Sequence, residues 1–74
     1  MSAINWQATC CGHHGEYAEH RLKAGGVARL KRTPGVDAWQ VCRFGTDNRA
    51  IDKDEDGVPA YVEMSEAEAL ALLA

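Results

Sequence analysis

The chain contains no apolar run that approaches the roughly 20 residues needed to cross a bilayer, and its first residues lack the basic and apolar regions of a signal peptide. Three cysteines, two of them adjacent at Cys10 and Cys11, do not form the disulfide framework of a small secreted domain. With 74 residues there is room for one domain. We therefore expect a single cytoplasmic domain, residues 1–74, with no membrane contact.

Catalytic motifs are also missing, since the chain has neither of the glycine-rich motifs that bind phosphates. Nucleophilic catalysis needs a nucleophile with a positioned base, and a chain this short has little core from which to build a pocket. A redox or zinc site would have to use Cys10, Cys11, His13 and His14 with distant Cys42, and these do not form the two spaced ligand pairs typical of structural zinc. We expect no enzymatic activity and no cofactor, and keep a small redox or metal protein as a third hypothesis.

Charge is divided unequally along the chain. Residues 1–43 hold six basic and three acidic side chains, a sum of +3, whereas residues 44–74 hold two and eight, a sum of −6, which together give the net charge of −3. The net charge and the pI of about 5.5 argue against direct nucleic-acid binding. The basic side chains Arg21, Lys23, Arg29, Lys31 and Arg32 could contact phosphate. Arg29 and Lys31 fit the solvent face of an amphipathic strand better.

Alternating apolar and polar residues predict a meander of three antiparallel strands, over residues 27–33, 38–44 and 58–64. The turn Thr33-Pro34-Gly35-Val36 joins the first two. Residues 45–57 are polar and predict a long loop, and residues 4–10 predict either a further strand or an ordered arm.

One or two helices are expected to cover this sheet. Residues 16–24 suit a short helix with Glu19 four residues before Lys23, although an extended conformation is the alternative because apolar residues there also alternate. The segment 65–74 is the clearer helix, because Ser65 and Glu68 form a capping box. Its apolar stripe is expected to be Ala67, Leu70 and Leu73. The predicted fold class is therefore α+β, a three-stranded antiparallel meander with one or two covering helices.

An EF-hand-like pattern begins at Asp52. Asp52, Asp54 and Asp56 with Gly57 and Glu63 match D-x-D-x-D-G-x5-E, in which carboxylates at positions 1, 3, 5 and 12 hold calcium. The flanking sequence is a poor match, because the entering helix is weak and no second loop is present. A calcium-binding module using residues 52–63 is the alternative function.

The leading hypothesis is an acidic binding surface. Asp52, Asp54 and Asp56 in an extended segment would project to one side about 6.6 Å apart, twice the rise of a strand, and a DNA strand also presents a regular row of negative charges. A small protein with such a row can occupy a basic groove built for DNA. The predicted partner-binding residues are Asp47, Asp52, Asp54, Glu55, Asp56, Glu63, Glu66 and Glu68.

Taken whole, the chain resembles the small anti-CRISPR proteins of phages and mobile elements, in particular inhibitors of type I-C surveillance complexes. The resemblance covers the arm 4–7, the strand 38–44, the acidic stretch 47–56 and the ending 65–74, and rests on size, charge and overall appearance. It implies a non-enzymatic inhibitor, often a DNA mimic, that binds a protein subunit of a CRISPR effector complex (Cascade) in the host cytoplasm and blocks recruitment of target DNA. We expect it to act as a monomer. The basic first half departs from a uniformly acidic mimic, so one acidic face is expected.

Overall fold

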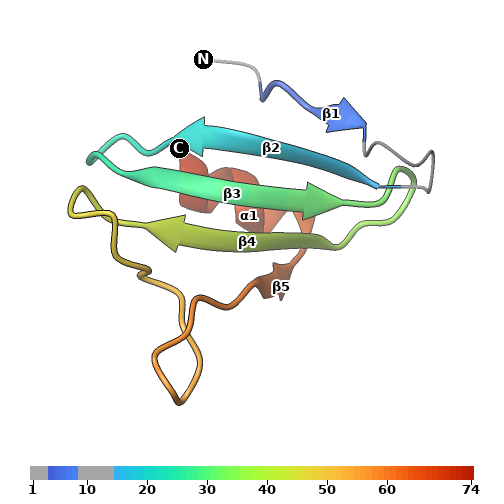
Figure 1. Ribbon diagram of the computed structural model, residues 1–74. Coiled ribbons are helices and arrows are strands. Elements are labelled where there is room, and N and C mark those ends of the chain that lie inside the picture. The colour runs from blue at the N-terminus through green and yellow to red at the C-terminus, as the bar shows by residue number, and fades with distance from the viewer. Residues whose placement is uncertain (1–3, 9–14) are drawn as a thin grey trace.

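The part of the protein that the structure describes is an antiparallel β-sheet of five strands with one helix across one face (Figure 1). The computed structural model describes residues 4–8 and 15–74. The strands lie side by side in chain order. They are β1 (Gln7–Ala8), β2 (Glu16–Arg21), β3 (Val27–Arg32), β4 (Trp39–Phe44) and β5 (Val62–Met64), and the helix is α1 (Glu66–Leu73).

The predicted α+β class is wrong, because strands dominate residues 4–8 and 15–74 and these contain only one short helix. The main error is the helix over 16–24, where β2 pairs with β3 through six residue pairs from Glu16↔Arg32 to Arg21↔Val27. A Glu–Lys pair four residues apart contributes only about 0.2–0.5 kcal/mol to a helix, which a full strand ladder outweighs. The extended alternative is the one observed, with Ala18 buried and its neighbours Tyr17 and Glu19 exposed.

Two of the three predicted strands lie where the alternation placed them, as β3 and β4. The third is shorter than 58–64, since only Val62–Met64 pairs with β4. Of the segment 4–10, the structure describes residues 4–8, in which the two-residue β1 pairs with β2. The sheet therefore has a short strand at each edge, which is typical of sheets that avoid pairing with other chains.

The core lies between the sheet and α1. Leu30, Val41 and Trp39 on the covered face are at most 3% exposed, and α1 adds Ala69 and Leu73. The predicted stripe through Ala67 and Leu70 is wrong, because both of these side chains are exposed. Ala69 and Leu73 are four residues apart and so lie on one side of the helix, which makes them the stripe that faces the sheet.

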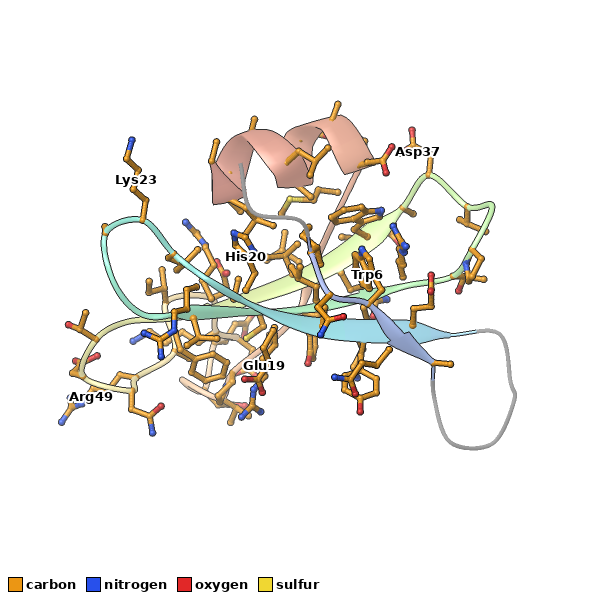
Figure 2. The ribbon with its side chains drawn as sticks, turned by 90° about the horizontal axis from the view of Figure 1, so that it is seen from above. Trp6, Glu19, His20, Lys23, Asp37 and Arg49 are labelled. Atoms are coloured by element: carbon orange, nitrogen blue, oxygen red, sulfur yellow. The ribbon has the colours of Figure 1, made fainter. Side chains whose placement is uncertain are left out.

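A cluster of two tryptophans and one arginine covers one edge of the core. The rings of Trp6 and Trp39 meet edge to face with centroids 4.9 Å apart. The Arg32 guanidinium lies 3.9 Å from the centroid of the Trp6 ring, and its Nε donates to Glu16 Oε1 at 2.9 Å. Arg32 thereby holds the N-terminal segment against the sheet through a cation–π contact. Figure 2 shows Trp6 on the helix side of the sheet.

The capping box of the C-terminal helix is confirmed. The Ser65 hydroxyl accepts a hydrogen bond from the Glu68 N–H, and the Glu68 carboxylate accepts one from the Ser65 N–H. Asp37 accepts a bond from the Glu66 N–H at 2.8 Å, which ties the start of α1 to the turn between β3 and β4. In the part of the chain that the structure describes, no helix is long and apolar enough to cross a membrane.

The turns can be tested with two glycines of similar backbone conformation, Gly26 at φ +88° and Gly35 at φ +84°. A Cβ on Gly26 would lie 2.2 Å from the carbonyl oxygen of Phe44, whereas one on Gly35 would meet nothing within 4 Å. Gly26→Ala should therefore lower the free energy of unfolding by at least about 3 kcal/mol and Gly35→Ala by only about 1 kcal/mol. Urea unfolding of both variants measures this, and equal losses would contradict the close approach at Gly26.

Candidate functional site

The chain turns back along β4 directly after that strand ends. Gly45 N–H donates to the Arg49 carbonyl and Asn48, at φ 65°, completes the turn. Ala50 then forms a bridge with Phe44, and the Ile51 N–H donates to the Arg43 carbonyl at 2.8 Å. Residues 50–52 therefore lie along the edge of β4 in line with β5. The residues between 52 and β5 form an insertion in this edge.

An ion pair between Arg43 and Asp52 fixes the start of this insertion. Arg43 Nε donates to Asp52 Oδ2 at 3.0 Å, Arg43 Nη2 donates to Oδ1 at 2.9 Å, and the Arg43 backbone N–H donates to Oδ2 at 2.9 Å. The Asp52 side chain is only 11% exposed. These hydrogen bonds hold the pKa of Asp52 below its usual value, although partial burial opposes them, and they raise the pKa of Arg43.

Residues 52–60 form a projecting hairpin, which we call the acidic hairpin (Figure 1, orange, at the bottom). At its base, the Ala60 N–H donates to the Asp52 carbonyl at 3.0 Å, and Lys53 and Pro59 form a bridge. At its tip, the Gly57 N–H donates to the Asp54 carbonyl and the Asp54 N–H donates to the Val58 carbonyl. Gly57 has φ +81°, so this is a type I turn followed by a left-handed glycine, a common hairpin closure.

The Asp54 carboxylate stabilises the tip from inside. Its Oδ1 accepts bonds from the Asp56 N–H at 2.9 Å and from the Val58 N–H at 3.0 Å. Aspartate commonly bonds its own backbone two residues on in turns. The side chains of Glu55 and Asp56 are exposed, and neither has an ion-pair partner among the described residues. The tip therefore presents carboxylates on a backbone held by several hydrogen bonds.

The other predicted carboxylates lie elsewhere. Asp47 is in the turn after β4, where it accepts from the Arg49 N–H and lies 4.0 Å from the Arg49 side chain. Glu63 is on β5 opposite Gln40. Glu66 and Glu68 are in the first turn of α1. The structure therefore brings together only Asp54, Glu55 and Asp56 of the eight, while Asp52 is already engaged by Arg43.

Calcium ligands are not assembled in the hairpin. The Arg43 guanidinium occupies both oxygens of Asp52, the first residue of the EF-hand pattern. Glu63, the twelfth, lies on β5 outside the loop. Within residues 4–8 and 15–74, no group of three or more His, Cys, Asp or Glu side chains is placed to hold a metal ion.

The cysteine and histidine candidates are only partly described. Cys10, Cys11, His13 and His14 lie outside the described residues. Cys42 is 2% exposed, and its Sγ lies 3.6 Å from the Asp52 carbonyl oxygen. Burial, together with the negative charge of Asp52, raises the pKa of this thiol. Cys42 is thus a packing residue beneath the base of the acidic hairpin.

The chain was compared with protein-family models, with curated proteins and with solved structures, and no match was found in any of the three. The candidate site is therefore defined by its own contacts: an acidic tip, a hydrogen-bonded stem, and the Arg43–Asp52 pair at the base.

Removing the charge of Asp52 tests the anchor. Asp52→Asn should reduce the free energy of unfolding at neutral pH by about 2 kcal/mol, because it replaces charge-assisted bonds with weaker ones. The pKa of Asp52 is lowered by folding, so its stabilising effect is complete above the unfolded-state value of about 4 and is lost as pH falls through the folded-state value. The difference in free energy of unfolding between wild type and Asp52→Asn should therefore be constant near neutral pH and become smaller in acid.

Asp56→Asn is the matched control, because this side chain is exposed at the tip. Urea unfolding of the three proteins, at neutral pH and at about pH 3, measures the effect. A control as destabilised as Asp52→Asn, or a deficit that does not change with pH, would contradict the role given to the ion pair.

Proposed function

We propose that this protein is a non-enzymatic inhibitor that binds a DNA-recognising subunit of a bacterial CRISPR effector complex and blocks recruitment of target DNA. The acidic hairpin is the proposed contact. The observation that supports it is the anchored tip, where Asp54, Glu55 and Asp56 project beyond the sheet edge on a hydrogen-bonded turn. The resemblance to small anti-CRISPR proteins supports the choice of partner.

Order in the hairpin matters because a flexible acidic loop loses conformational freedom when it binds. Each immobilised side chain costs about 0.5–1.5 kcal/mol, and a preorganised loop avoids part of this cost. The base bond between Ala60 and Asp52, together with the Arg43–Asp52 pair, sets the direction of the stem before any partner arrives. A projecting tip of this kind fits a concave basic groove better than a flat surface.

The mimicry proposed is local. With Asp52 paired to Arg43, the hairpin carries three free acids against Lys53, a sum of −2. Asp47, Glu63, Glu66 and Glu68 lie elsewhere on the molecule, and contribute to the long-range field rather than to the contact. Such a field speeds the encounter with a basic groove and weakens with salt.

The test uses a purified type I-C effector complex and a double substitution at the tip. Glu55→Gln with Asp56→Asn removes two charges without touching Asp52 or Asp54, which support the hairpin itself. We expect this variant to bind the complex at least about tenfold more weakly. The complex should then bind target DNA in its presence. Isothermal titration calorimetry and a DNA-binding competition assay measure the two effects.

The matched control removes two charges away from the hairpin, with Asp47→Asn and Glu66→Gln. It should change affinity by less than about threefold. Equal losses in both double variants would remove the hairpin as the contact. A wild-type protein that neither binds the complex nor affects its DNA binding would overturn the proposed function as a whole.

A further inference from the structure

The sheet face opposite α1 has a composition unlike the rest of the molecule. No described helix or loop crosses the front of β2 and β3 in Figure 1. Strand register places Tyr17 beside Lys31 and Glu19 beside Arg29 on this face. Figure 2 shows Glu19 on this side, away from the helix. Tyr61, just before β5, completes the group through its contact with Lys31. We call this group the open face.

A shallow hollow of about 220 Å³ lies within the open face, lined in part by Tyr17, Tyr61, Arg29 and Lys31. Tyr17 is 45% exposed and Tyr61 is 39% exposed. Lys31 Nζ lies 4.5 Å from the centroid of the Tyr61 ring, and Arg29 Cζ lies 5.2 Å from that of Phe44. The aromatic rings therefore hold the two cations close to the sheet, beside the hollow.

We propose that the open face binds single-stranded nucleic acid. A base would stack on a tyrosine in the hollow, and the flanking phosphates would contact Arg29 and Lys31. Sheet faces that combine exposed aromatic side chains with basic ones are suited to this, because every base has a π face and every nucleotide carries a phosphate. A duplex fits less well, because its base faces are already stacked.

The open face has a different charge from the protein as a whole. Arg21, Arg29 and Lys31 alternate with inward residues on β2 and β3, whereas the acids that face the same side are Glu19 and Glu63, a sum of +1 in a chain of −3. Glu19 lies 3.9 Å from Arg29, but both side chains are more than half exposed, so the pair binds only weakly. A phosphate can therefore compete for Arg29. The low pI, which argued against nucleic-acid contact, does not describe this face.

This site is separate from the acidic tip of the hairpin, which contributes no residue to it. The acidic tip lies beyond the β5 edge, while the hollow lies over β2 and β3. Glu55→Gln with Asp56→Asn should leave oligonucleotide binding intact or strengthen it. Failure of one proposal would therefore leave the other unaffected.

Fluorescence anisotropy with labelled oligothymidylate and oligouridylate of about 12 nucleotides tests the proposal. The full chain should bind both, or one of them, with a Kd of about 1–100 µM at about 50 mM salt, and more weakly as salt rises. Tyr61→Leu should weaken binding about fivefold or more through lost stacking, and Tyr17→Leu provides a second, more exposed variant. Lys31→Gln should weaken binding and reduce the salt slope by about one.

The matched control is Lys23→Gln, because Lys23 is also exposed but lies on the helix side in Figure 2. It should change affinity by less than about twofold. Three results would overturn the proposal: no saturable binding by the wild type, equal losses in Lys23→Gln and Lys31→Gln, or equal competition by a polyglutamate peptide of matched charge. Thermal melts confirm that each variant is folded.

Discussion

The ion pair between Arg43 and Asp52 determines how the second half of the chain is arranged. Arg43 is the last inward-facing residue of β4, and its guanidinium and backbone N–H together take both oxygens of one carboxylate. That carboxylate begins the acidic hairpin, and its backbone carbonyl accepts the bond that closes the hairpin base. Asp52 thus connects the edge of the sheet to the stem of the hairpin. Without Asp52, the polar residues 50–60 would have few apolar contacts to hold them against the sheet. Ile51 and Val58, the large apolar side chains of this segment, are both more than half exposed.

The sheet converts an unequal sequence into a molecule with two different charged regions. Successive side chains of β2 and β3 point to opposite faces of the sheet. Most of their basic side chains therefore lie on the open face, and Ala18, Ala28 and Leu30 lie in the core. Arg32 is the exception, because it faces inward and stacks on Trp6. The acidic second half forms the hairpin and the start of α1. A negative tip and a more positive face on one small protein are compatible with binding to a ribonucleoprotein, in which basic protein grooves and exposed nucleic acid occur together.

Local signals predicted the elements whose stability is local. The capping box at Ser65 and the alternation in β3 and β4 predicted a helix and two strands that are observed. Residues 16–24 were ambiguous because both periods fit, and only the pairing of β2 with β3 decides between them. The pairing of Asp52 was not predicted for a related reason. Its partner lies nine residues earlier in a strand, and nothing in the sequence distinguishes Arg43 from the other basic residues. Tyr17 and Tyr61 line one hollow only because of the order of strands in the sheet, so this hollow has no sequence signal.

Backbone amide hydrogen exchange tests most directly whether the hairpin is held in place before binding. The Asp54 and Ala60 amides donate across the stem and base of the hairpin, at 2.9 and 3.0 Å. If the Arg43–Asp52 pair anchors the hairpin, both amides should exchange at least about 100-fold more slowly than in an unstructured peptide, as expected for hydrogen-bonded edge structure. Exchange at the unprotected rate, while the amides of β4 remain protected, would show that the hairpin is open in solution and would contradict the account.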